Sequence, residues 1–143
     1  MEDSIFTKII KGEIPCYKIA ENDNFIAFLD VNPLQEGHTL VVPKTQIDYI
    51  YDLPEDILSE LFIFSKSVAK KIEVSIKCER IGIAVIGLEV PHAHIHLIPI
   101  NEISDMNFQN QRIELNKDDF QNLRKNFSKE DFEKTTNKIL DSN

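Results

Sequence analysis

The feature that most constrains this chain is an alternation of histidine with apolar residues near the end of its first hundred residues. Three histidines alternate there with three apolar side chains, in the order His92, Ala93, His94, Ile95, His96, Leu97. Because the side chains of a β-strand point alternately to the two faces of a sheet, the pattern predicts a strand over residues 90–100. One face of this strand would enter the core and the other would carry a row of imidazoles. Such a row has no evident packing purpose, so we interpret it as a functional site.

The rest of the first hundred residues predicts an α+β fold with a mainly antiparallel sheet. A short helix is expected near the N-terminus, with Ser4 as its N-cap and Gly12 just past its end. The longest helix is expected from Pro54 to about Val74, because apolar and small residues recur there at helical spacing. Its predicted core-facing stripe consists of Leu58, Leu61, Phe62, Ser65, Val68, Ala69 and Ile72. Besides 90–100, strands are expected over residues 17–21, 25–30, 39–42 and 81–86.

Composition changes after residue 100, where apolar residues become few and the expected helices are highly charged. Asn116 and Ser128 are good N-caps for two short helices, and the pair Ser128 and Asp131 resembles a capping box. We expect one domain over 1–143, with its core in about 4–100 and a helical extension over 101–143. That extension could pack on the body, pack on a partner subunit or be partly frayed.

Charge and hydropathy exclude several classes of protein. The formal net charge of −8 repels phosphate polymers, so no nucleic-acid partner is expected. No apolar run approaches the roughly 18 residues of a membrane span, and no signal peptide is evident. Cys16 and Cys78 are expected to be reduced thiols, which makes the cytoplasm the expected compartment.

Two kinds of chemistry suit the histidines. In an extended strand His92 and His96 lie about 13 Å apart, so three rings could not easily converge on a metal, and a distant ligand such as His38 would be needed. Alternatively, a neutral imidazole can attack phosphorus, while a second ring donates a hydrogen bond and a third fixes the orientation of the first. The second use tolerates the spread along a strand.

Four ordered segments resemble the histidine triad (HIT) family of nucleotide hydrolases and transferases. They are the opening SIFTKIIKGEIP (4–15), FIAFLD (25–30), GHTLVVPK (37–44) and the His-x-His-x-His strand. The resemblance covers about residues 4 to 100, and all four histidines of the chain lie inside it. It implies a HIT-like fold with a five-stranded sheet, one long helix and short terminal helices.

The resemblance also implies roles for individual residues. His94 would attack the α-phosphate and form a nucleotidyl-histidine intermediate, and His96 would contact the phosphate. His92 and His38 would be supporting groups, and Glu89 a phosphate-side contact. Asp30 would bind the ribose hydroxyls of a purine nucleotide, although an aspartate before Asn32 could simply start a turn. The base would lie against Ile5, Phe6, Ile9, Ile14, Phe28 and Val31.

The sequence departs from the family pattern in ways that affect the prediction. Many relatives hold a structural zinc with two cysteines and a histidine where Ser4, Thr7 and Gln46 stand, so no metal and no cofactor are expected here. The loop before the triad is short, so the sequence does not specify which leaving group the substrate carries. The resemblance favours a phosphoramidase that cleaves AMP- or GMP-type phosphoramidates. The alternatives are a dinucleoside polyphosphate hydrolase and a weakly catalytic nucleotide sensor or adaptor.

The family pairs through its long helix and a sheet edge, which implies a homodimer. The sequence itself also favours pairing, because Ile57, Phe64 and Leu61 give the long helix apolar surface beyond a narrow stripe. The charged C-terminal helices could instead cover such surfaces within one chain.

Overall fold

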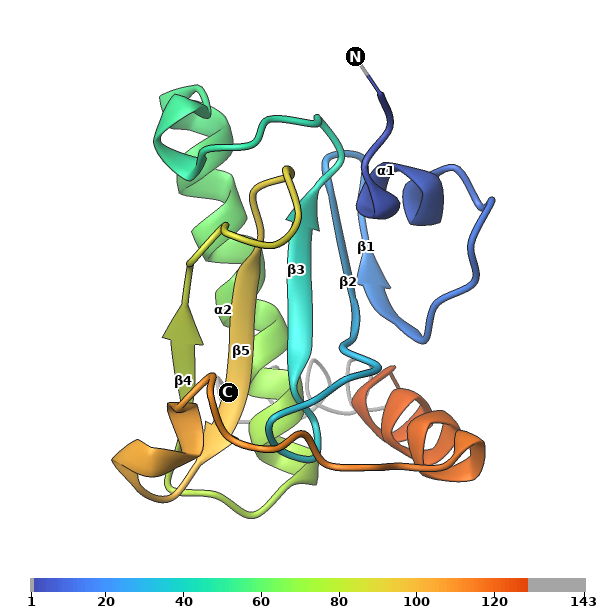
Figure 1. The fold of residues 1–143 in the computed structure, drawn as a ribbon, viewed down its shortest axis with the longest axis vertical. Coiled ribbons are helices and arrows are strands. Elements are labelled where there is room, and N and C mark those ends of the chain that lie inside the picture. The colour runs from blue at the N-terminus through green and yellow to red at the C-terminus, as the bar shows by residue number, and fades with distance from the viewer. Residues whose placement is uncertain (1, 129–143) are drawn as a thin grey trace, which may run out of the picture.

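A computed structural model describes residues 2–128 and places five antiparallel strands in one sheet, in the order β1-β2-β3-β5-β4 (Figure 1). The predicted α+β class, the five-stranded sheet and the long helix are confirmed. Two short 3₁₀ helices, η1 (Ile50–Asp52) and η2 (Ile103–Met106), lie in the connections. The α-helices and strands are α1 (Ile5–Ile10), β1 (Lys18–Glu21), β2 (Phe25–Leu29), β3 (Thr39–Pro43), α2 (Glu55–Ser75), β4 (Arg80–Ala84) and β5 (Ile95–Ile100), followed by a helix over 117–128.

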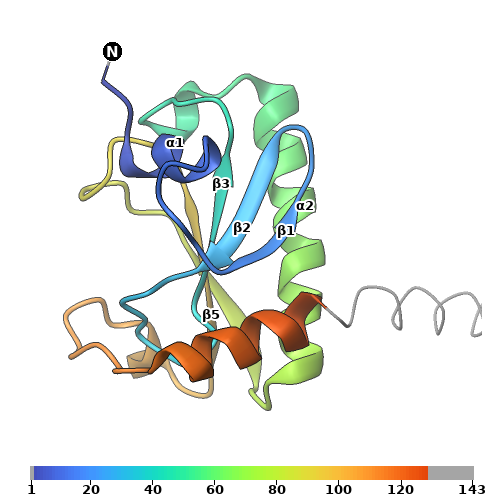
Figure 2. The ribbon, with the colours of Figure 1, turned by 90° about the vertical axis from the view of Figure 1, so that its right-hand side faces the viewer.

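The sheet is covered differently on its two faces (Figure 2). The long helix α2 packs on one face, where the larger apolar cluster includes Val41, Leu61 and Ile95. The short helix α1 lies on the other face, where Phe6 joins a smaller cluster with Phe28. The face with the smaller cluster is covered by the short helix α1 and not by α2, so part of it is available for a site.

Both ends of the described residues pack against this body. Ser4 is the N-cap of α1, and its hydroxyl accepts a hydrogen bond from the Thr7 N–H at 3.0 Å. The helix over 117–128 starts as predicted, because the side chains of Asn116 and Asp119 cap each other's backbone N–H groups. Its apolar side chains Phe120, Leu123 and Phe127 are buried in the larger cluster. Ser128 lies inside this helix, and the capping box expected with Asp131 lies outside the described residues.

The predicted strand over 90–100 is wrong in its first half. β5 begins at Ile95, so His92 and His94 precede it. Pro91 has no N–H for a ladder, and the His92 N–H instead closes a tight turn onto the Val90 carbonyl at 2.8 Å. The alternation still holds for the apolar partners, because Ala93, Ile95 and Leu97 all belong to the larger cluster. The strand expected over 81–86 similarly ends early, at Ala84.

The predicted stripe of the long helix also needs one correction. Leu61, Val68 and Ile72 are fully buried, but Phe62 is 43% exposed. Ile57 and Phe64, which were expected to extend the free apolar surface, are partly buried and pack on the chain's own core. Among residues 2–128, no helix is both long and apolar enough to cross a membrane.

Candidate active site

His96 projects from β5 onto the face of the sheet that carries α1. It lies opposite Leu40 of β3, and Leu40 lies opposite Phe28 of β2. Directly opposed residues of antiparallel strands share a face, so the imidazole stands in line with the apolar side chains of the smaller cluster. Its neighbours Ile95 and Leu97 point into the core behind it, which fixes the direction of the ring.

His94 is buried and held by the backbone immediately before β5. Its Nδ1 lies 2.7 Å from the His92 carbonyl oxygen. A carbonyl only accepts, so Nδ1 carries the proton and Nε2 keeps its lone pair. The Phe6 ring packs edge-on against the imidazole, with 4.9 Å between centroids. Burial lowers the pKa of His94, so the ring is neutral and has a free nucleophilic nitrogen at pH 7.

His38 and His96 form a directed pair. The Leu34 N–H donates to Nδ1 of His38 at 3.0 Å, which requires that the proton of His38 sits on Nε2. That Nε2 lies 3.0 Å from Nδ1 of His96, so His38 donates and His96 keeps its own proton on Nε2. Burial lowers the pKa of His38 to about 3 and that of His96 to about 4. A backbone amide therefore fixes both tautomers, and His96 is a neutral hydrogen-bond donor.

His92 points away from the other rings, toward the N-terminus of α1. Its Nε2 lies 2.8 Å from the Pro43 carbonyl, and its Nδ1 lies 2.7 Å from the Ser4 hydroxyl. Thr7 and Gln46 complete this cluster, with the Thr7 hydroxyl donating to the amide oxygen of Gln46 at 2.5 Å. Hydroxyl and amide groups are poor zinc ligands compared with thiolate and imidazole, and here they bond to one another. The cluster does not fit a zinc ion.

A second group of side chains offers metal ligands on the sheet. Within residues 2–128, Asp30, His38 and His96 place one ligand atom each within 4.8 Å of one another. A metal on Nε2 of His38 would need the lone pair there, but the Leu34 N–H fixes the proton on that nitrogen. His38 instead donates its Nε2 hydrogen to His96. Oδ2 of Asp30 lies 3.5 Å from the same nitrogen. The hydrogen-bond pattern opposes a metal ion in this group.

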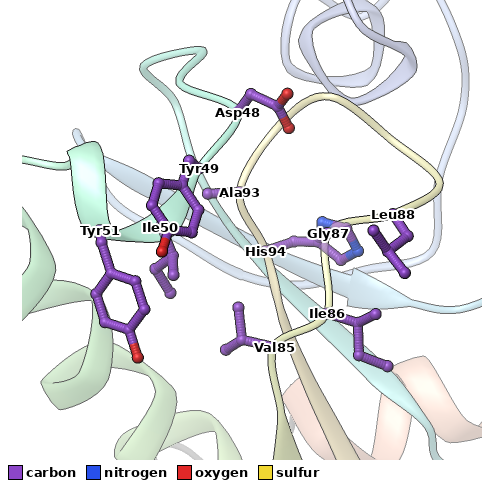
Figure 3. Close-up of a pocket in the computed structure, with 10 residues that line it drawn as sticks. All are labelled: Asp48, Tyr49, Ile50, Tyr51, Val85, Ile86, Gly87, Leu88, Ala93 and His94. Carbon is purple, nitrogen blue, oxygen red and sulfur yellow. The ribbon is translucent and has the colours of Figure 1, made fainter.

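Two cavities share His94 as a wall. The smaller, of about 310 Å³, lies between the segment 85–88 and the tyrosines Tyr49 and Tyr51, and Figure 3 shows the His94 ring beside Gly87 and Leu88. The larger, of about 420 Å³, contains both His94 and His96. Its other lining residues are Asp30, Asn32, Ile86, Gly87, Leu88, Glu89, Phe108, Gln109 and Arg112.

The predicted polar site residues Asp30 and Glu89 line the larger cavity, whereas the apolar residues predicted to contact the base do not. Asp30 follows β2 and lines the larger cavity, where burial raises its pKa, and Glu89 lies on the rim of the same cavity. Oδ1 of Asp30 also accepts a hydrogen bond from the Asn32 N–H at 2.8 Å, which is the turn-forming bond expected as an alternative. Phe6 and Phe28 are packed in the smaller cluster, with Ile9 partly buried beside them. Ile14 is half-buried, whereas Ile5 and Val31 are exposed.

Sequence reasoning missed the residues that the C-terminal segment brings to the site. Phe108 packs edge-to-face with His96, with centroids 4.9 Å apart, and lies 6.3 Å from the His38 ring. Arg112 follows it and places its guanidinium carbon 5.7 Å from the Phe108 ring centroid. The signal available was one aromatic and one arginine in a polar stretch, which has no recognisable spacing.

The protein is thus an α+β protein with an antiparallel sheet between α1 and α2 and a cluster of four histidines. Hydrogen bonds to the backbone and between rings determine which ring nitrogens of these histidines carry a proton. The chain belongs to the HIT family, because the HIT domain model matches residues 11–103.

Individual relatives support this assignment. A HIT-like protein of Methanocaldococcus jannaschii is 43% identical over an alignment of 102 positions, and the match covers 66% of this chain and 77% of that protein. The adenosine 5′-monophosphoramidase of Saccharomyces cerevisiae is 39% identical over an alignment of 97 positions, and the match covers 66% of this chain and 61% of that enzyme. The crystal structure of a Hit-like protein from Bartonella henselae matches with a TM-score of 0.77 and 27% identity, over 89% of this chain and 95% of that one.

Proposed function

We propose that this protein hydrolyses nucleoside 5′-phosphoramidates through a nucleotidyl-histidine intermediate on His94. The observation that carries the proposal is the hydrogen bond from His94 Nδ1 to the His92 carbonyl, because it leaves Nε2 free to attack phosphorus. The similarity to a yeast adenosine 5′-monophosphoramidase supports a P–N bond as the bond cleaved.

The proposed chemistry has two displacements at the α-phosphorus. Nε2 of His94 forms a bond to phosphorus as the P–N bond breaks, and the leaving nitrogen takes a proton from water. The resulting hydroxide then adds to phosphorus and displaces His94. One water is consumed, and the products are a nucleoside monophosphate and an amine. The His92 carbonyl stabilises the positive charge that His94 carries in the intermediate, because it accepts the Nδ1 proton throughout.

The other histidines are proposed to position and stabilise. The Nε2–H of His96 donates to a non-bridging phosphate oxygen as charge develops there, and His38 holds that tautomer in place. His92 orients the backbone carbonyl that His94 uses, because its own ring is tied to Ser4 and Pro43. Asp30 accepts the ribose hydroxyls, and Glu89 lies at the phosphate side.

Replacing the nucleophile tests the proposal. His94→Ala should abolish turnover of an adenosine phosphoramidate and leave AMP affinity largely intact, because a nucleophile acts mainly in the transition state. Rapidly quenched wild-type protein should carry a nucleotidyl adduct by mass spectrometry, and the variant should not. Near-wild-type turnover by the variant would show that His94 is not the nucleophile. Binding of AMP without single-turnover chemistry in the wild type would favour a nucleotide sensor.

A further inference from the structure

The larger cavity contains a charge that the proposed chemistry does not use. Among the described residues that line it, Arg112 is the one cationic side chain, and Asp30 and Glu89 are anionic. Its Nη1 is buried and has no hydrogen-bond partner within residues 2–128. A buried guanidinium N–H without a partner is costly, so its place beside two histidines calls for a ligand.

Arg112 is held in this position by its neighbours in the chain. Its guanidinium packs over the ring of Phe108, which in turn packs on His96. The next residue, Ile113, donates its backbone N–H to the Pro33 carbonyl at 2.9 Å, which ties the segment to the loop after β2. The segment is also fixed at its start, where the Asn110 side chain donates to the Ser104 carbonyl at 2.7 Å. The guanidinium is therefore preorganised rather than free at the surface.

An anionic substrate needs such a group here. The imidazoles of His38 and His96 are neutral at pH 7, because burial lowers the pKa of each to about 3 and about 4. They can donate hydrogen bonds, but they carry no charge against a phosphate. The two carboxylates and the net charge of −8 repel one.

We infer that Arg112, from the C-terminal segment, is a phosphate-binding residue whose guanidinium donates to the phosphate oxygens of a nucleotide in the larger cavity. This inference rests on the proposed function, since it assumes that a nucleotide occupies the site. It assigns to residues 108–112 a part in selecting nucleotides over nucleosides.

Calorimetric titration with AMP and with adenosine tests the inference, because the two ligands differ only in the phosphate. Arg112→Met keeps much of the side-chain length and the packing on Phe108 but removes the charge. It should weaken AMP binding roughly 10- to 100-fold, the size of a charged hydrogen bond, and leave adenosine binding unchanged. Arg112→Lys should restore part of the loss. Arg124→Met is the matched control, because Arg124 bonds to Gln121 on the helix 117–128 away from this cavity, and it should behave as wild type.

The outcomes separate the inference from the proposed function. An unchanged preference for AMP over adenosine in Arg112→Met overturns the inference, as does an equal loss of both ligands, which indicates a structural role. AMP binding that depends on Arg112, in a wild-type protein that turns over no phosphoramidate, supports the inference and overturns the hydrolase. A wild-type protein that binds neither ligand overturns both.

Discussion

Nε2 of His38 lies 3.0 Å from Nδ1 of His96, and the Leu34 N–H fixes which of the two rings donates. The proton on the far side of His96 is thus determined by a backbone amide in the loop before β3. Two histidines that are distant in sequence act as one unit whose hydrogens are already arranged before any ligand binds.

This relationship predicts how His38 variants behave. His38→Leu should lower kcat about 100-fold, the usual effect of losing one preorganised donor, because His96 could then adopt either tautomer. AMP affinity should change little. His38→Gln should recover part of the rate, since its amide nitrogen can reach the position of Nε2 and donate to His96. Steady-state kinetics with both variants check this, and equal rates for the two would contradict it.

Stability should fall as the pH falls below 6.5. In the unfolded chain each histidine takes up a proton near pH 6.5, whereas burial lowers the pKa of His38 to about 3 and that of His96 to about 4 in the folded protein. The unfolded state therefore binds more protons between pH 6.5 and 4, and the free energy of unfolding drops by up to about 1.4 kcal/mol per pH unit for each histidine. Asp30, whose pKa burial raises, acts in the opposite direction as a single group.

Urea denaturation at pH 7, 5.5 and 4.5 measures this dependence. His38→Gln is the control, because it removes the titration of His38 and should flatten the curve. A free energy of unfolding that is constant over this range in the wild type would show that the buried imidazoles do not stay neutral.

Gly37→Ala should destabilise the protein by roughly 2–4 kcal/mol, from backbone strain and overpacking together. Gly37 has φ of 93°, and an added Cβ would clash with Cδ1 of Ile76. Gly12→Ala is a matched control, because Gly12 has φ of 80° but no atom within 4 Å of such a Cβ. It should cost only about 1 kcal/mol. Adding Ile76→Val, which removes Cδ1, should partly rescue Gly37→Ala in thermal unfolding.

The purified protein should contain no stoichiometric zinc, and a chelator should not reduce its activity. The reason is the hydrogen-bonded cluster in which Ser4, Thr7 and Gln46 surround His92. Elemental analysis showing about one tightly bound zinc per chain would contradict this. Because the four side chains converge, the triple variant Ser4→Cys, Thr7→Cys and Gln46→His should acquire zinc, and the wild type measured alongside it is the control.

A homodimer remains a prediction, and the structure indicates a different surface for it than the sequence did. β4 is an edge of the sheet, and its Ile83 is 50% exposed. On α2, Phe62 and Ile63 are 43% and 67% exposed. An uncovered edge with apolar neighbours is stabilised by pairing. Light scattering at low micromolar concentration should give twice the 16.5 kDa chain mass, and Ile83→Lys should halve it. An active wild-type monomer would show that pairing is not required.

The sequence predicted the fold well where local patterns decide it. The caps at Ser4 and Asn116 and the stripe of α2 through Leu61 and Ile72 are short-range signals, and the elements formed there. The prediction went wrong where tertiary contacts compete with local pattern. β5 starts late because the backbone N–H groups of His92 and Ala93 donate to loop carbonyls instead of to a neighbouring strand.

The site was predictable only in part for the same reason. The histidines stand in one short motif and in the segment before β3, so their types and spacing suggested their chemistry. Which ring nitrogen holds a proton depends on partners such as Leu34, which no spacing reveals. Phe108 and Arg112 reach the cavity because the chain turns back after β5, and their approach to His96 is a purely tertiary effect.

That turn back across the sheet has a consequence for protein synthesis. A nascent chain that has emerged through Ile100 already contains all five strands and all four histidines. It still lacks Phe108 and Arg112, and with them one wall of the larger cavity. The sheet can therefore form while the ribosome is still translating, whereas the complete cavity exists only after the next dozen residues have followed. Ligand capture by stalled chains of increasing length would then report when the last wall is added.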